Sequence, residues 1–145
     1  MTDEEYMKVA LDEAIKGKGK VEPNPMVGCL IVEDGEIVAK AYHEEYGGLH
    51  AERNALNQLE RDPKEGAVMY VTLEPCCTVG KTNACTDYII RSGIKKVVVG
   101  IIDANPSHNG TGIDILRRAG IEVKVGILQK KCRDLNANYN ACFGQ

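Results

Sequence analysis

The chain of 145 residues contains no tryptophan and one phenylalanine, and it has no apolar run near the roughly 20 residues that a membrane-spanning helix needs. It also lacks an excess of basic residues, because 18 Lys and Arg stand against 21 Asp and Glu and give a net charge of −3. The first absence excludes a membrane-spanning helix, and the second argues against broad nucleic-acid binding. Only a local basic group at Lys130, Lys131 and Arg133 favours such binding.

The N-terminal residues are not expected to be a secretory leader. The first residues, Met1 to Glu5, are acidic and are typical of a helix start. Six cysteines without a leader favour a reducing compartment, so we expect a cytoplasmic protein whose cysteines bind metal or are buried. The length fits a single domain, and we expect residues 1–145 to form one.

Hydrophobic periodicity and turn residues predict an α/β domain. Thr2 and Glu5 form a capping box before a helix that ends at Gly17 and Gly19. Two strands, 27–32 and 37–42, flank Asp34-Gly35, which is a strong two-residue hairpin signal. The rest of the pattern predicts helices over 50–59, 83–92, 113–119 and 128–138, and strands over 67–73, 97–102 and 121–125. This alternation predicts parallel neighbouring strands with helices on both faces of one sheet.

One histidine and two cysteines stand where strands and loops run into predicted helices. His50 and Cys85 lie near two helix starts, and Cys76 follows the strand 67–73. One imidazole and two thiolates can hold a zinc ion with one coordination position open. Glu52, two residues after His50, is placed to move protons to and from a water at that position. Zinc deaminases have the pattern H-x-E followed by P-C-x-x-C. Here the second half is stretched, because eight residues separate Cys76 from Cys85.

Each of these residues also has a plainer interpretation. His50 alone is typical of a partly buried histidine, Glu52 of a solvated acid at a helix start, and the cysteines of small buried hydrophobic residues. The metal site is favoured because, without it, all of these plainer interpretations would have to be true at the same time. Cys76 and Cys77 compete for one ligand position, and Cys76 is favoured because it directly follows Pro75. Three further cysteines have no ligand spacing: Cys29, Cys132 and Cys142.

Further motifs accompany the metal pattern: Pro23-Asn24-Pro25-Met26-Val27-Gly28, His50-Ala51-Glu52, Thr72-Leu73-Glu74-Pro75-Cys76, Gly80-Lys81-Thr82 and Asp103 with Asn105-Pro106. On these motifs, residues 3–136 closely resemble the deaminase half of the bifunctional riboflavin-biosynthesis deaminase/reductase, within the cytidine deaminase-like superfamily. The long Cys76–Cys85 spacing is that family's form. The resemblance implies a three-layer α/β/α sandwich around a five-stranded mixed sheet, and one Zn²⁺ per chain.

The resemblance also implies an activity, a site and an assembly. The activity is hydrolytic deamination of 2,5-diamino-6-ribosylamino-pyrimidinone 5′-phosphate at its ring, a small-molecule substrate, by a homo-oligomer (dimer or tetramer). It further implies roles for eight residues: His50, Cys76 and Cys85 would bind zinc, Glu52 would shuttle protons, Asn24 and His43 would help to hold the substrate, Lys81 would lie near its ribose-phosphate end, and Thr78 would face it.

Several residues depart from the family pattern. Thr78 stands where the family usually has a histidine, and Leu49, Asn83-Ala84 and Ala104 stand where it has prolines. These departures keep a paralogous deaminase of another nucleoside, nucleotide or free base as the second hypothesis. A tRNA or DNA deaminase is a third, and a non-catalytic zinc module with Cys77 as a fourth ligand is a fourth. His108 is expected to be only a loop residue.

Overall fold

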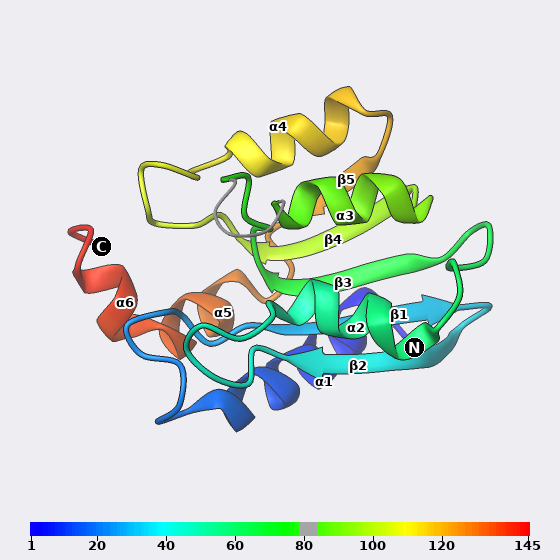
Figure 1. Ribbon diagram of the computed structural model, residues 1–145. Coiled ribbons are helices and arrows are strands. Elements are labelled where there is room, and N and C mark those ends of the chain that lie inside the picture. Colours follow the sequence, from blue (N-terminus) through cyan, green and yellow to red (C-terminus); the bar gives the residue numbers. More distant parts are fainter. Residues whose placement is uncertain (79–83) are drawn as a thin grey trace.

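A five-stranded mixed sheet forms the centre of the computed structural model, which describes residues 1–78 and 84–145. The strands lie in the order β2-β1-β3-β4-β5 (Figure 1). Their bounds are β1 Gly28–Glu33, β2 Glu36–Tyr42, β3 Val68–Leu73, β4 Lys96–Ile101 and β5 Glu122–Val125. β1 pairs antiparallel with β2 and β3, whereas β4 pairs parallel with β3 and β5. The predicted hairpin and the predicted parallel neighbours are both confirmed.

Seven helical segments surround the sheet in the described part of the chain: α1 Asp3–Ala14, the short 3-10 helix η1 Ile15–Gly17, α2 Ala51–Leu59, α3 Cys85–Ser92, α4 Thr111–Arg118, α5 Gln129–Leu135 and α6 Ala137–Ala141. The capping box of Thr2 and Glu5 is formed as predicted. None of the described helices is both long and apolar enough to cross a membrane.

The C-terminal helix predicted over 128–138 is wrong in one respect, because the chain forms two helices there. Asn136 separates them with φ −115° and ψ 41°. Its side chain bonds to the backbone of Met26, far away in the sequence. Helix periodicity cannot show such a contact, so the pattern predicted one continuous helix.

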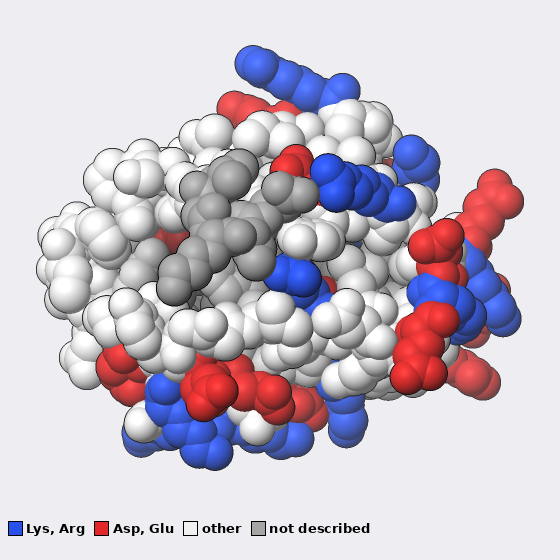
Figure 2. Space-filling model, in the orientation of Figure 1, with Lys and Arg blue, Asp and Glu red and all other residues white. Residues whose placement is uncertain are grey.

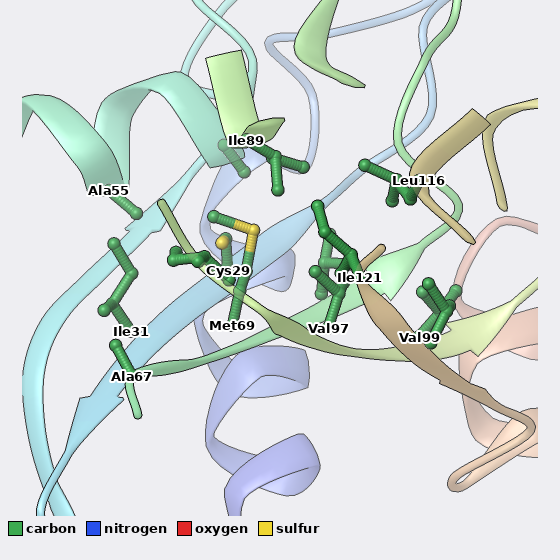
Figure 3. Packing of buried hydrophobic residues seen from close by; sticks show 14 of the residues in the cluster. Cys29, Ile31, Ala55, Ala67, Met69, Ile89, Val97, Val99, Leu116 and Ile121 are labelled. Carbon is green, nitrogen blue, oxygen red and sulfur yellow. The ribbon is translucent and has the colours of Figure 1, made fainter. Parts of the chain in front are cut away.

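Two hydrophobic clusters, one on each face of the sheet, give the fold three layers. On one face, α2, α3 and α4 contribute Ala55, Ile89 and Leu116 to a cluster that includes Met69 and Val97 from the sheet (Figure 3). On the opposite face, α1 and α5 pack residues such as Met7 and Cys132 against the sheet. β4 is buried on both faces, as its unbroken apolar run predicts. The predicted α/β/α sandwich is confirmed.

The loops after β3 and β4 meet because the carboxyl ends of parallel strands lie at the same edge of a sheet. Glu74 follows β3 and is buried, and its carboxylate accepts hydrogen bonds from four backbone N–H groups. These donors belong to Asp103 (3.1 Å), Gly110 (2.9 Å), Gly112 (2.9 Å) and Ile113 (3.3 Å). Gly112 has no room for a side chain, because a Cβ there would collide with the carbonyl oxygen of Pro75. Glu74 thus holds the loop after β4 against the segment that carries Cys76.

Replacing Glu74 by glutamine is expected to lower the free energy of unfolding by about 3 kcal/mol, because an amide NH₂ would face backbone donors that now bond to a carboxylate oxygen. Urea denaturation of both proteins measures the difference. The matched control is Glu122→Gln, which removes a carboxylate from an exposed ion pair with Lys96 and should change stability by less than about 0.5 kcal/mol. Equal effects of the two substitutions would contradict the anchoring role of Glu74.

Candidate active site

His50, Cys76 and Cys85 come together at the edge of the sheet where β3 ends. His50 is the N-cap of α2, Cys85 is the first residue of α3, and Cys76 follows β3 through Glu74 and Pro75. Nδ1 of His50 lies 3.2 Å from Sγ of Cys85 and 3.5 Å from Sγ of Cys76. The three ligand atoms all lie within 4.8 Å of one another. The structure therefore brings together the three residues that the sequence predicts as zinc ligands.

The geometry of this cluster fits a zinc ion. Tetrahedral zinc with a nitrogen ligand at about 2.0 Å and sulfur ligands at about 2.3 Å places nitrogen and sulfur about 3.5 Å apart. The two separations from Nδ1 of His50 are close to that value. His50 is exposed, whereas Cys76 is half-buried and Cys85 is buried, so the cluster is open on one side. Within residues 1–78 and 84–145, no fourth His, Cys, Asp or Glu side chain joins the group. Three ligands of this kind leave one coordination position for a water.

The two thiols influence each other's ionisation. Hydrogen bonds from the Cys85 thiol and from His50, together with the backbone N–H of Cys85 at 3.3 Å, lower the pKa of the Cys76 thiol. The Cys76 thiolate in turn raises the pKa of Cys85, and burial acts in the same direction. The protein alone thus favours one thiolate of the pair. A bound divalent cation would favour two, because metal ligation deprotonates a thiol.

Cys77 faces different surroundings from Cys76. Its sulfur lies 3.6 Å from Nδ1 of His108 and 3.9 Å from the carbonyl oxygen of Ser107, in the loop after β4. It does not belong to the cluster of ligand atoms. This geometry favours Cys76 as the ligand and leaves Cys77 out of a closed four-ligand site. The other cysteines lie elsewhere: Cys29 and Cys132 are buried in the two hydrophobic clusters, and Cys142 is exposed.

Glu52 lies beside the cluster without being one of its ligands. It is in the first turn of α2 and is only 3% exposed, and it lines the same cavity as His50 and Cys76. Burial raises the pKa of its carboxyl to about 7, and the Cys76 thiolate acts in the same direction. A carboxyl group with a pKa near neutrality can both accept and release a proton. The structure thus puts a buried carboxyl with a pKa near neutrality in the same cavity as two of the candidate metal ligands.

Asn24 and His43 line the same cavity as His50 and Cys76. Nδ1 of His43 donates to the carbonyl oxygen of Leu49 at 2.9 Å, so Nε2 is the acceptor for the Asn24 amide at 3.3 Å. His43 is 3% exposed, and burial lowers its pKa, which favours the neutral imidazole. The ring of His43 meets that of His50 edge to face, with 5.3 Å between centroids. Because the amide nitrogen of Asn24 is used in this way, its carbonyl oxygen is left to accept a hydrogen bond from a ligand.

Sequence reasoning missed several residues that line the cavity. Asp103 and Asn105 follow β4, His108 lies farther along the same loop, and Tyr139 comes from α6. His108, expected only as a loop residue, thus lies in the wall of the cavity. A signal existed for Asp103 and Asn105, because side chains after neighbouring parallel strands meet at one sheet edge. The cavity of about 190 Å³ exceeds the roughly 150 Å³ of a cavity known to hold a benzene ring, so it has room for one small ring.

For two of the residues predicted to contact the substrate, Thr78 and Lys81, the structure provides no support. Thr78 is exposed and is not among the residues that line the cavity. Lys81 lies outside the described residues, and so does Asn83. Of the three predicted substrate contacts that the structure describes, Asn24 and His43 line the cavity and Thr78 does not. The roles predicted for Thr78 and Lys81 stay predictions.

Comparison with known proteins agrees with this geometry. Residues 1–101 match the family model of the cytidine and deoxycytidylate deaminase zinc-binding region. The riboflavin biosynthesis protein RibD of Actinobacillus pleuropneumoniae is 52% identical over 136 residues, which are 94% of this chain and 36% of that protein. This chain therefore spans little more than a third of the length of that relative.

A relative of similar length exists in Buchnera aphidicola subsp. Schizaphis graminum. This diaminohydroxyphosphoribosylamino-pyrimidine deaminase is 43% identical over 139 residues, which cover 96% of this chain and 94% of the relative. Among solved structures, the diaminohydroxyphosphoribosylaminopyrimidine deaminase/5-amino-6-(5-phosphoribosylamino)uracil reductase of Thermotoga maritima is 44% identical. It superposes with a TM-score of 0.92 over 98% of this chain and 41% of that chain. The chain therefore belongs to the family defined by the cytidine and deoxycytidylate deaminase zinc-binding region.

Proposed function

We propose that the chain is a zinc-dependent hydrolytic deaminase of 2,5-diamino-6-ribosylamino-pyrimidinone 5′-phosphate, acting in riboflavin biosynthesis with residues 1–145 as one domain. The observation that carries the proposal is the buried Glu52 carboxyl beside the cluster of His50, Cys76 and Cys85, with Glu52, His50 and Cys76 lining one small cavity. The likeness to the Buchnera deaminase over nearly the whole length of both chains supports the choice of substrate.

In this proposal His50, Cys76 and Cys85 hold the zinc ion. When bound there, zinc supplies Lewis-acid activation of a water molecule at its open position. Glu52 takes up the proton that the water loses and passes it to a ring nitrogen of the substrate. A carbon–oxygen bond forms at the amine-bearing carbon. Glu52 then takes the remaining proton of the added hydroxyl group and delivers it to the amine, so that the carbon–nitrogen bond breaks and a ring carbonyl and ammonia result.

Asn24 and His43, which also line the cavity, orient the substrate ring in this account. The neutral His43 holds the amide nitrogen of Asn24, and the Asn24 carbonyl oxygen accepts a hydrogen bond from an amine or ring N–H of the substrate. The two prolines that flank Asn24 restrict the backbone, so the amide is presented in one direction. A diaminopyrimidinone offers several N–H donors and suits such an acceptor.

Ammonia release by the purified, zinc-loaded protein tests the proposal. The diaminopyrimidine ribosyl phosphate is compared with cytidine, dCMP, guanine and adenosine under the same conditions. Turnover of the pyrimidinone phosphate in preference to the others is expected. Turnover of another compound would favour the second hypothesis, a deaminase of a different nucleoside, nucleotide or base, and would contradict the proposed substrate.

Lys81 is proposed to contact the phosphate, since the ammonium group of a lysine suits that anion. Lys81→Ala is expected to raise KM for the phosphorylated substrate about tenfold, as loss of one charge-assisted hydrogen bond would. Steady-state kinetics on the phosphorylated and dephosphorylated compounds measures this. Lys8→Ala is the control, because Lys8 is an exposed lysine of α1 that is not among the residues lining the cavity, and it should change neither KM. An equal effect of Lys81→Ala on both compounds would remove its phosphate role.

The acidic balance of the chain favours a small-molecule substrate over tRNA or DNA. On the face drawn in Figure 2, basic and acidic side chains lie next to one another, and the described residues of this face form no continuous basic surface. An oligomeric assembly and a cytoplasmic location remain predictions of the same proposal.

A further inference from the structure

The side chain of Asn136 joins the C-terminal segment to the loop that carries Asn24. Its Oδ1 accepts a hydrogen bond from the backbone N–H of Met26 at 2.7 Å, and its Nδ2 donates to the carbonyl oxygen of Met26 at 2.8 Å. Asn136 is 7% exposed, and it occupies the break between α5 and α6. One buried amide thus satisfies both backbone groups of a single residue that lies 110 positions earlier.

A residue from outside this loop can fix the direction of the Asn24 side chain by bonding to the backbone of Met26. Pro23 and Pro25 fix their own φ angles and lack N–H groups, so they cannot be anchored by donation. The N–H of Asn24 is used by the carbonyl oxygen of Val21 at 2.8 Å. Met26 follows directly, and its two bonds to Asn136 fix the end of this short rigid segment.

A chain of hydrogen bonds continues from Asn24 towards the candidate metal ligands. The Asn24 amide donates to His43, and His43 donates to the carbonyl oxygen of Leu49, the residue before His50. The C-terminal segment touches the other wall of the cavity as well, because the hydroxyl of Tyr139 donates to Oδ1 of Asp103 at 2.7 Å. One short segment is therefore attached to two walls of the cavity.

We infer that Asn136 is a positioning residue of the deaminase site, which acts by fixing the Asn24 amide through the backbone of Met26. Asn136 lies outside residues 1–101, the part of the chain that the family model matches. The α5–α6 segment is thus part of the substrate pocket as well as of the outer layer. The inference rests on the proposed function for its kinetic readout, but the placement of Asn24 can be measured without turnover.

Asn136→Asp is the test variant, because it keeps an acceptor for the N–H of Met26 and removes the donor to its carbonyl oxygen. Asn138→Asp is the matched control, since Asn138 is exposed on α6 and carries the same change of charge. We expect Asn136→Asp to raise KM for the diaminopyrimidine ribosyl phosphate about tenfold, with kcat changed less than about threefold and zinc content unchanged. Asn138→Asp should leave both kinetic constants as they are.

Two further readouts separate positioning from a general loss of stability. In the Asn136→Asp protein, the NMR signals of the Asn24 side-chain amide should shift and the Met26 amide should exchange faster, whereas neither should change in Asn138→Asp. A lower Tm with an unchanged KM and an unchanged Asn24 signal would overturn the inference, and so would loss of zinc with a collapse of kcat. If the wild-type protein does not turn over the pyrimidinone phosphate, the proposed function fails, and the Asn24 signal alone then decides the inference.

Discussion

Replacing Glu52 by glutamine is expected to lower kcat by about 10²- to 10⁴-fold while the protein keeps its fold and its zinc. Glutamine has nearly the same shape as glutamate, so it fits the buried site, but its amide cannot take up and release the protons that deamination moves. Glu52 is not among the ligand atoms, and metal content should therefore stay at the wild-type value. Steady-state ammonia release and zinc analysis on the same preparation measure both quantities.

The control for this substitution is Glu45→Gln, which changes an exposed carboxylate in the loop before His50. It should leave kcat and zinc content unaltered. A kcat for Glu52→Gln equal to that of the wild type would remove Glu52 from the proton-transfer role. Loss of zinc in Glu52→Gln would instead mean that the carboxylate supports the metal.

Cys76→Ala is expected to lose stoichiometric zinc and with it all measurable turnover, whereas Cys77→Ala keeps both. The two residues are neighbours in the sequence, but only Cys76 has its sulfur within the cluster of ligand atoms. Zinc also stabilises a protein that binds it only when folded, by about 2.7 kcal/mol at a free concentration of 100 times Kd. The rise in Tm on adding zinc should therefore vanish in Cys76→Ala and persist in Cys77→Ala.

This pair of variants also distinguishes catalysis from a purely structural zinc site. A closed structural site needs a fourth protein ligand, and Cys77 was the candidate that the sequence offered. Zinc loss in Cys77→Ala together with wild-type zinc content in Cys76→Ala would contradict the proposed ligand set. Zinc loss in both would indicate a four-ligand site without an open position.

The sequence predicted the fold because its signals are local. The capping box of Thr2 and Glu5, the Asp34-Gly35 turn and the apolar run of β4 each determine a neighbouring element without help from distant residues. Alternation of helices and strands then leaves few topologies for one sheet. The candidate zinc ligands were predictable for a similar reason, since His50 and Cys85 stand at helix starts.

The parts that the sequence did not show depend on contacts between distant residues. Asn136 interrupts the final helix, and its amide bonds to Met26. Tyr139 reaches the cavity because α6 packs beside the loop after β4, where its hydroxyl meets Asp103. His108 was expected to be only a loop residue, because no pattern of spacing indicates that its loop contacts Cys77. Contacts between residues that are distant in the sequence determine these positions. The periodicity of a single sequence carries no information about such contacts.

Oxygen-18 incorporation tests the central claim most directly. The zinc-loaded protein is incubated with the diaminopyrimidine ribosyl phosphate in water enriched in oxygen-18, and product mass and ammonia are measured together. Hydrolytic deamination predicts one labelled oxygen in the product for each ammonia released. The Glu52→Gln protein should release at most about one hundredth as much product and ammonia in the same time. Absence of ammonia from the wild-type protein, or a product without the label, would contradict the account.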